Sequence, residues 1–208
     1  MQLQPAPTHY KKNIKMPILK KTNLTFHPLT KERWKDLEKL FGPRGAVGGC
    51  WCMWWRIKRS EYDKQKGEGN KKSLKKIINS GEVPGILAYQ NDEPVAWCSI
   101  QPREKFSVLE RSRVLQKIDD NPVWSIVCFF VRKDFRNKGL SVALIKEAIN
   151  YAQKMGAKII EGYPTEPKKG KAPDVFVHTG IFSAFKKAGF KEAARRSETR
   201  PVMRFNVK

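Results

Sequence analysis

The pattern of apolar and polar positions changes its period in the middle of the chain. Residues 124–131 are almost wholly apolar and rich in aromatic and β-branched side chains, which predicts a strand covered on both faces. From about Lys138 the apolar residues recur at i, i+3 and i+4, as they do on one face of a helix. That face consists of Leu140, Ala143, Leu144, Ala148, Tyr151, Ala152 and Met155. Gly156 suits the C-terminal end of this helix.

The residues on either side of this unit predict short elements of both kinds. Before it we expect a strand at 24–29, a helix at 30–40, a loop at 42–49, a strand at 50–57, a loop or frayed helix at 60–72, a short helix at 74–78, a hairpin of 85–90 with 94–100, and partly helical structure at 103–118. After it we expect a strand at 157–163, parallel to the first by the crossover rule, a loop at 164–174, a helix at 181–188, and antiparallel strands at 190–195 and 201–207. This order predicts an α/β (α+β) fold.

The chain divides into a short arm and one domain. Residues 1–22 contain lysines, prolines and no acidic residue, so we expect a mobile basic arm. Residues 23–208 are expected to form a single domain. No apolar segment approaches the ~18 residues needed to span a bilayer, and no signal-peptide core is evident. We therefore expect a cytoplasmic protein with no membrane partner.

Charge adds a constraint on partners. The 208 residues include 42 Lys and Arg against 20 Asp and Glu, a formal net charge of +22. Such an excess favours anionic partners: nucleic acid, an acidic membrane surface or a phosphorylated cofactor. The lysines are spread along the whole chain, however, which also fits a generally Lys-rich solvated surface.

The four cysteines are Cys50, Cys52, Cys98 and Cys128. Cys98 and Cys128 lie in apolar runs, where free cysteine behaves as a small hydrophobic residue. A Cys-x-Cys pair with two isolated cysteines lacks the usual spacing of zinc ligands. We therefore expect no disulfides and no metal.

The turn at residues 136–141 is the first candidate binding site. Its small residues allow close approach of the backbone, and the free N–H groups at the start of the next helix bind anions, phosphates especially. An ordinary strand-to-helix connection is the alternative for a basic turn with one glycine.

Three features together carry a resemblance to a known family. Val131 ends a strand, Arg136-x-x-Gly139-x-Ser141 opens a helix, and Phe185-Lys-Lys-Ala-Gly-Phe190 lies near the C-terminus. Over most of residues 22–207 this order resembles the GNAT family of acetyl-CoA-dependent N-acetyltransferases. The family's turn is Arg/Gln-x-x-Gly-x-Gly/Ala, so Ser141 departs from it. The resemblance implies a mixed, mostly antiparallel central sheet flanked by helices, with a splayed parallel strand pair forming the cofactor cleft.

The resemblance also implies which residues hold coenzyme A. Backbone N–H groups in the turn would bind the pyrophosphate, with added charge from Arg136 and Lys138. The turn residues concerned are Asn137, Lys138, Gly139, Leu140 and Ser141. The pantetheine arm would pair with the end of the central strand, at Phe129, Phe130 and Val131. No metal is implied.

The implied reaction is direct attack of a primary amine on the thioester of acetyl-CoA. Many family members place a tyrosine acid four residues before the glycine of the last helix, and here that position is Phe185. Tyr163 and Ser183 are the replacements we name for the acid. For the base we favour Glu161, with Asp119 or Asp120 second.

A covalent route is the alternative within the same chemistry. Cys128 lies on the implied central strand, but the sequence offers no evident base beside it, because the three histidines are far away in the chain. We therefore prefer direct attack to an acyl-cysteine route.

The aromatic segment 50–57 is the candidate acceptor site. Strand alternation would place Cys50, Cys52 and Trp54 on one side, and Trp51, Met53 and Trp55 on the other. Trp51, Trp54 and Trp55 beside the Gly-rich loop would make a wall of an acceptor pocket, and core packing explains them equally well. The expected acceptor is a small-molecule or peptide amine. A dimer is compatible with the sequence.

A different class of function competes with catalysis. The charge of +22 and the exposed aromatic residues would suit a nucleic-acid-binding module without activity. No recognised nucleic-acid motif occurs in the sequence.

Overall fold

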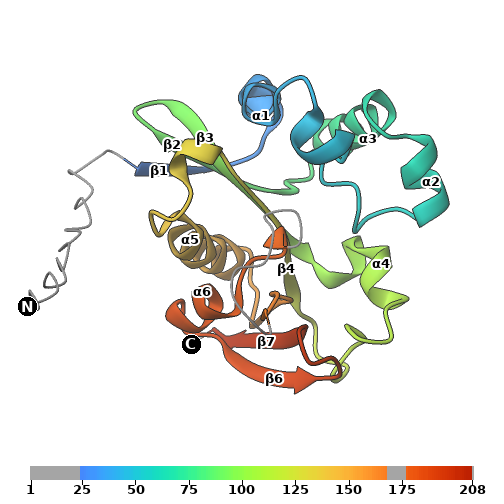
Figure 1. Ribbon diagram of the computed structural model, residues 1–208, viewed down its shortest axis with the longest axis vertical. Helices are drawn as coiled ribbons and strands as arrows, with labels where there is room; N and C mark the ends of the chain where they lie inside the picture. The colour runs from blue at the N-terminus through green and yellow to red at the C-terminus, as the bar shows by residue number, and fades with distance from the viewer. Residues whose placement is uncertain (1–23, 168–176, 208) are drawn as a thin grey trace, which may run out of the picture.

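One seven-stranded sheet runs through the protein (Figure 1), in the order β1-β2-β3-β4-β5-β7-β6. The computed structural model describes residues 24–167 and 177–207. The strands are β1 (Leu24–Pro28), β2 (Gly85–Gln90), β3 (Glu93–Pro102), β4 (Trp124–Val131), β5 (Ile159–Gly162), β6 (Lys191–Arg195) and β7 (Pro201–Asn206). Only β4 and β5 pair in parallel, and the other neighbours are antiparallel. The predicted fold class is confirmed.

Helices cover both faces of this sheet (Figure 1). They are α1 (Trp34–Phe41), α2 (Arg59–Lys64), α3 (Glu68–Asn79), α4 (Ser107–Glu110), α5 (Leu140–Lys154) and α6 (Phe182–Lys187), with short turns η1 (Lys31–Arg33), η2 (Gly45–Gly49), η3 (Arg103–Lys105) and η4 (Lys133–Phe135). One core cluster joins α1 and α3 to Trp97, Val127 and Tyr163. A second joins α5 and α6 to the opposite side of the sheet. None of the helices within the described residues is long and apolar enough to cross a membrane.

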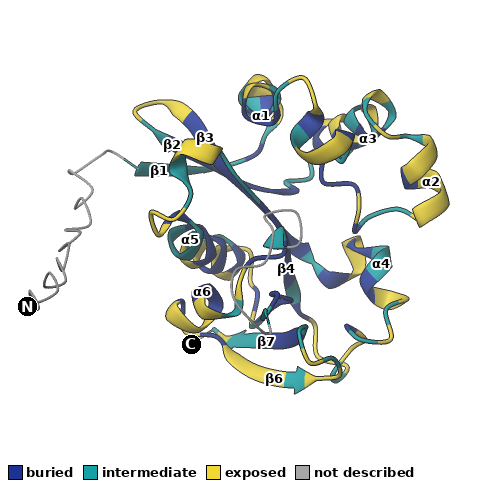
Figure 2. Ribbon diagram, in the orientation of Figure 1, coloured by how far each residue is buried: buried dark blue, intermediate teal, exposed yellow. Residues whose placement is uncertain are grey.

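The central strand, turn and helix form as the sequence pattern predicts. The side chains of β4 are buried from Ser125 to Phe129, and Figure 2 shows the central strands enclosed between exposed outer elements. Helix α5 buries Leu140, Leu144, Ile145, Ala148, Ile149 and Ala152. Met155 departs from the prediction: it follows the last helical residue, and its side chain is 55% exposed.

The hairpin of β2 and β3 closes through a tight polar turn. Asn91 and Asp92 both have positive φ, 49° and 65°. Two such residues form the turn whose twist matches that of the adjoining strands, and Asn and Asp tolerate this conformation. The predicted hairpin is therefore confirmed, and β3 extends beyond it to Pro102.

The predicted strand at 50–57 is wrong. Trp51 and Cys52 have φ values of 42° and 55°, and the N–H of Met53 bonds the carbonyl of Cys50 at 2.8 Å. These turns destroy strand alternation, so neighbouring side chains are buried together while Trp54 is 37% exposed. The cause lies outside the segment: a Cβ at Gly45 would be 2.1 Å from Trp51 Nε1, so the indole packs directly on glycine.

Two other expectations have different outcomes. Most of residues 60–72, expected as loop or frayed helix, belong to α2 and to the start of α3. The predicted arm at 1–22 lies outside the described residues, as does most of the predicted loop at 164–174.

The parallel pairing of β4 with β5 is short. It joins Trp124, Ser125 and Ile126 to residues 160–162 and then ends, whereas β4 continues to Val131 against β3. A Cβ at Gly162 would be 2.0 Å from the Phe185 ring, so the α6 side chain packs against the end of β5. Beyond Ile126 the two strands no longer pair, and we call this region between them the fork.

Replacing Leu144 by Ala should lower the free energy of unfolding by about 3 kcal/mol, because it removes buried methylene groups and leaves a cavity. Leu144 is fully buried on α5. Urea denaturation followed by circular dichroism measures the loss. Lys146→Ala, on the exposed side of the same helix, is the control and should stay within about 0.5 kcal/mol of wild type. Equal losses in both variants would contradict this packing.

Candidate functional site

The fork exposes main-chain groups of β4 that no strand partner uses. The N–H of Arg132 bonds Val95 of β3, so by strand alternation Phe129 and Val131 direct their N–H and C=O groups toward the fork. The Phe129 N–H donates to the His178 carbonyl at 2.6 Å. Arg136 Nε donates to the Val131 carbonyl at 3.0 Å. Both groups therefore bond irregular structure.

The turn before α5 lies near the end of β4 and leads into the start of a long helix. Asn137 and Gly139 have φ values of 59° and 79°, and Leu140 begins a helix of 15 residues. The first N–H groups of a helix have no intrahelical acceptor. Nothing lies within 4 Å of where a Cβ on Gly139 would sit, so a ligand has room beside these donors.

The structure brings the predicted cofactor residues together. Phe129, Phe130 and Val131 end β4, and residues 136–141 follow after the short turn η4. Asn137, Lys138 and Gly139 are exposed, whereas Ser141 is half-buried inside the first turn of α5. Main-chain donors and basic side chains thus meet at one end of the sheet.

The predicted catalytic pair, Glu161 and Tyr163, lies in a buried network of hydrogen bonds. The Tyr163 hydroxyl donates to Glu161 Oε2 at 2.9 Å, is 2.8 Å from Ser125 Oγ, and accepts from Arg103 Nη1 at 2.8 Å. Arg204 Nη2 donates to Glu161 Oε1 at 2.7 Å. Glu161 is 1% exposed and Tyr163 fully buried. Both carboxylate oxygens are therefore occupied.

Electrostatics in this network follow from burial and pairing. Burial, followed by the Glu161 charge, raises the pKa of Tyr163 far above its usual value of 10.0. Asp119 bonds the Arg204 guanidinium at 2.6 and 3.2 Å, and this contact lowers the pKa of Asp119 from 3.8 to about 2. Asp119 thus belongs to the same network, whereas Asp120 is exposed. The general acid and base stay predictions.

The position of the family's tyrosine, here Phe185, and the alternative acid Ser183 have different surroundings. Phe185 is fully buried, with its ring centroid 6.1 Å from Phe129 and 5.0 Å from Phe190. Its ring forms the apolar side of the fork. Ser183 is exposed on α6.

The three tryptophans proposed for the acceptor do not form one wall. Trp51 is buried and stacks on Trp34, with ring centroids 5.8 Å apart. Trp54 is partly exposed, and the Arg59 guanidinium lies 4.2 Å from its ring centroid. Trp55 is buried, and its ring lies 6.3 Å from that of His178. Their roles in acceptor binding stay predictions.

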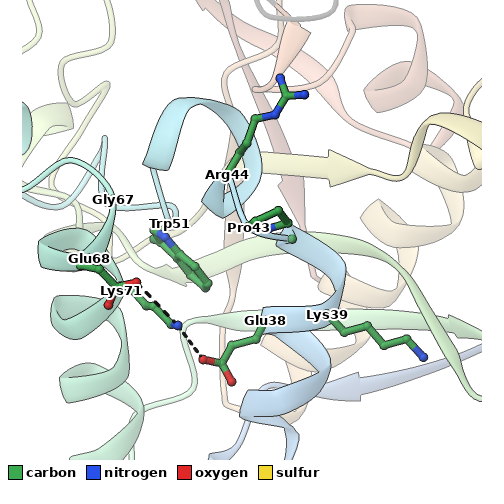
Figure 3. A pocket seen from close by; sticks show the side chains of 9 residues that line it. Glu38, Lys39, Pro43, Arg44, Trp51, Gly67, Glu68 and Lys71 are labelled. Carbon is green, nitrogen blue, oxygen red and sulfur yellow. Dashed lines mark ion pairs between the residues drawn. The ribbon is translucent and has the colours of Figure 1, made fainter.

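Trp51 borders an open pocket between α1 and α3, shown in Figure 3. The pocket has a volume of about 580 Å³ and is lined by Glu38, Lys39, Gly42, Pro43, Arg44, Trp51, Gly67, Glu68 and Lys71. Lys71 Nζ bonds Glu38 at 2.9 Å and lies 5.3 Å from the Trp51 ring centroid. The pocket therefore offers an aromatic surface beside paired charges.

The site also contains residues that the sequence did not single out. Arg103 and Arg204 complete the Glu161 network, and no local pattern marks an arginine as buried. The Cys52 sulfur accepts from Trp97 Nε1 at 2.9 Å, and the Cys128 thiol lies 3.9 Å from the carbonyl oxygen of Phe129. All four cysteines are free. Within residues 24–167 and 177–207, no group of three or more His, Cys, Asp or Glu could hold a metal ion.

Comparison with known proteins relates this geometry to a family. Residues 51–168 match the model of the acetyltransferase (GNAT) family. No curated protein matches the sequence.

Solved structures of similar fold include a PaiA N-acetyltransferase from Thermoplasma acidophilum in complex with coenzyme A, at 15% identity and a TM-score of 0.51, covering 88% of this chain and 99% of that one. An aminoglycoside N-acetyltransferase, AAC(6')-Iy in complex with CoA, has 13% identity, a TM-score of 0.53 and coverage of 88% and 97%. The NatC complex bound to Gag peptide and CoA has 10% identity, a TM-score of 0.51 and coverage of 89% and 99%. At these identities the likeness shows the fold alone.

Replacing Glu161 by Gln should destabilise the protein by about 3 kcal/mol, because it removes the buried carboxylate charge that pairs with both Arg103 and Arg204. Guanidinium chloride unfolding at neutral pH provides the measurement. Glu192→Gln is the matched control, since Glu192 pairs with Arg195 at 2.6 Å on the surface and should cost less than about 1 kcal/mol. Similar losses of unfolding free energy in the two variants would show that the Glu161 network stabilises the protein no more than a surface ion pair does.

The Asp119 contact should make stability depend on pH in acid. Its folded pKa of about 2 lies below the usual 3.8, so its stabilisation is complete above the unfolded pKa and disappears as pH falls through the folded pKa. The stability difference between wild type and Asp119→Asn should therefore be full from about pH 5 upward, decrease as pH falls below 3.8, and disappear only below about pH 2, by denaturant unfolding at each pH. Asp120→Asn, at the exposed neighbour, should show no such trend; a difference for Asp119→Asn that is constant with pH would contradict the assignment.

Proposed function

The chain belongs to the acetyltransferase (GNAT) family, whose model matches residues 51–168, and we propose that it transfers the acetyl group of acetyl-CoA to a primary amine. The observation that carries this proposal is the left-handed Gly139, which opens a long helix beside the fork. A helix start suited to phosphate and a strand edge without a strand partner at one place suit a nucleotide thioester.

The turn would hold the pyrophosphate of coenzyme A. The N–H groups of residues 137–141 supply the donors, and the open space over Gly139 supplies the room. Arg136 and Lys138 add positive charge, which strengthens hydrogen bonds to phosphate oxygens. Ser141 replaces the usual small residue, and its half-buried side chain leaves this space free.

The fork would hold the pantetheine arm against the edge of β4. Phe129 and Val131 present main-chain groups there, and the Phe129 N–H bonds the His178 carbonyl. If the pantetheine arm accepts a hydrogen bond from the Phe129 N–H, the arm replaces the His178 carbonyl as its acceptor. The buried N–H of Phe129 therefore keeps a hydrogen-bond partner. The segment carrying His178 would move aside by that exchange.

The bound thioester supplies an activated acetyl group that an uncharged amine attacks directly. An alkylamine with a pKa near ~10 loses a proton first, which calls for a base near the fork. Glu161 is our proposed base and Tyr163 our proposed acid. Because guanidinium and phenol groups already occupy both Glu161 oxygens, we propose that the pair also positions the fork.

The acceptor is proposed to be a small-molecule or peptide amine. The similar folds include an aminoglycoside N-acetyltransferase and a complex bound to a peptide, and both acceptor classes carry amines. Trp51 at the open pocket, with Trp54 and Trp55 nearby in the chain, remains our proposed acceptor surface. Nucleic-acid binding, a cytoplasmic location and dimerisation stay predictions.

Coenzyme A should bind the purified protein, and Gly139→Asp should weaken binding at least about tenfold, or about 1.4 kcal/mol, by placing bulk and negative charge beside the phosphates. Isothermal titration calorimetry measures both affinities. Gly156→Asp is the matched control, because Gly156 has a φ of 87°, equally open surroundings and a place at the other end of α5.

Three results separate the outcomes. Unchanged affinity in a folded Gly139→Asp variant would place the cofactor elsewhere, and equal weakening by Gly156→Asp would indicate a general loss of folding. No binding to wild type would overturn the proposed function. A screen of amines with acetyl-CoA, read as release of free thiol, then identifies the acceptor.

A further inference from the structure

Residues 177–181 lie in the fork, and we call them the strap. On one side, the His178 carbonyl accepts from the Phe129 N–H of β4 at 2.6 Å. On the other side, the N–H of Thr165, which follows β5 in the chain, donates to the Gly180 carbonyl at 2.9 Å. A parallel bridge also joins Thr165 to the strap. The strap therefore takes the position of a strand between β4 and the continuation of β5.

Close packing seats the strap between two aromatic rings. Gly180 has a φ of 87°, and a Cβ there would lie 2.8 Å from the Phe185 ring and 3.0 Å from the Phe129 ring. The strap also turns back on itself, because the Gly180 N–H donates to the Val177 carbonyl at 2.8 Å. The rings leave no free space along this part of β4. A pantetheine arm that pairs with Phe129 therefore cannot enter while the strap is in place.

The seated strap carries a buried hydroxyl without a partner. Thr179 is fully buried, and its Oγ1 has no hydrogen-bond partner in the described part of the chain. Burying a hydroxyl without a partner is unfavourable, whereas the same hydroxyl bonds water once it is exposed. The unpaired hydroxyl therefore opposes the contacts that hold the strap in the fork.

We propose that the strap is an autoinhibitory element, which occupies the place of the pantetheine arm, so that coenzyme A binds only to molecules whose strap has left the fork. This inference rests on the proposed function, because it concerns the same cofactor at the same strand edge. When only a fraction of the molecules is open, the measured affinity is the intrinsic affinity reduced by that fraction. The Thr179 hydroxyl raises the open fraction and thereby sets the affinity for coenzyme A.

Thr179→Val tests the strap, because it removes the unpaired hydroxyl and keeps the branched shape of the side chain. The closed strap becomes more stable, and coenzyme A should bind about tenfold more weakly, the equivalent of about 1.4 kcal/mol. The association rate constant should fall about tenfold, whereas the dissociation rate constant should keep its wild-type value. Stopped-flow tryptophan fluorescence measures both, since the Trp55 ring lies 6.3 Å from that of His178 in the strap.

Gly180→Ala should act in the opposite direction. An alanine at this positive φ is strained and meets both neighbouring rings, so the closed strap loses stability and association should become about fivefold faster. Thr25→Val is the matched control for Thr179→Val, because Thr25 lies on β1 at the far edge of the sheet. Both rate constants of this control should stay within about twofold of wild type.

The rate constants of Thr179→Val decide the inference, even if Gly180→Ala fails to fold. Unchanged association would show that the strap does not compete with coenzyme A. Faster dissociation with unchanged association would mean that the Thr179 hydroxyl touches the cofactor directly, which also overturns the inference. A loss of stability in Thr179→Val, measured by urea unfolding, contradicts it as well, because the hydroxyl then has a partner in the folded protein.

Calorimetry of the wild-type protein with coenzyme A separates this inference from the proposed function. Binding to wild type together with a failed rate test rejects only the strap. Absence of binding to both wild type and Gly180→Ala rejects the proposed function as well.

Discussion

The early end of the β4–β5 pairing is the constraint on which the site depends. Two parallel strands normally satisfy each other's main-chain groups along their shared length. Here the pairing stops at Ile126, and the Phe185 ring packs on Gly162 at the end of β5. Phe129 and Val131 then keep main-chain groups that only irregular structure or a ligand can satisfy. The turn proposed to bind phosphate follows after the short turn η4, so the two parts of the proposed coenzyme A site adjoin.

A buried ionic network holds the strands on which this fork depends. Arg103, Glu161 and Arg204 connect the segment after β3 to β5 and β7, and Tyr163 and Ser125 complete their hydrogen bonds. Charges buried in this way cost desolvation energy, which only full pairing offsets. The network therefore adds little to the free energy of unfolding. Its main effect is to fix the position of β5 beside β4. It also explains why both carboxylate oxygens of Glu161, which the sequence placed at the cleft, already accept hydrogen bonds.

The aromatic segment after η2 shows how a strained loop can assemble chemistry from distant parts of the chain. Positive φ at Trp51 and Cys52 turns successive side chains inward, against Trp34 and against β3. Such conformations cost of order 1–3 kcal/mol each and persist where the surroundings enforce them. The indole packed on Gly45 provides that enforcement. As a result one residue, Trp51, borders the open pocket, and its neighbour Cys52 accepts a hydrogen bond from Trp97 of β3.

The sequence by itself determined the order of elements, the buried strand β4, the amphipathic α5 and the phosphate-type turn between them, because hydrophobic period and glycine placement act locally. It also carried the family, through residues that lie close together in the chain. Only the tertiary structure decided that 50–57 is not a strand, that Glu161 is paired by two distant arginines, and that the Cys52 sulfur accepts a hydrogen bond from Trp97. Each of these depends on contacts between residues far apart in the chain. The spacing of residues along the sequence does not indicate such contacts, because tertiary packing rather than local propensity brings them about.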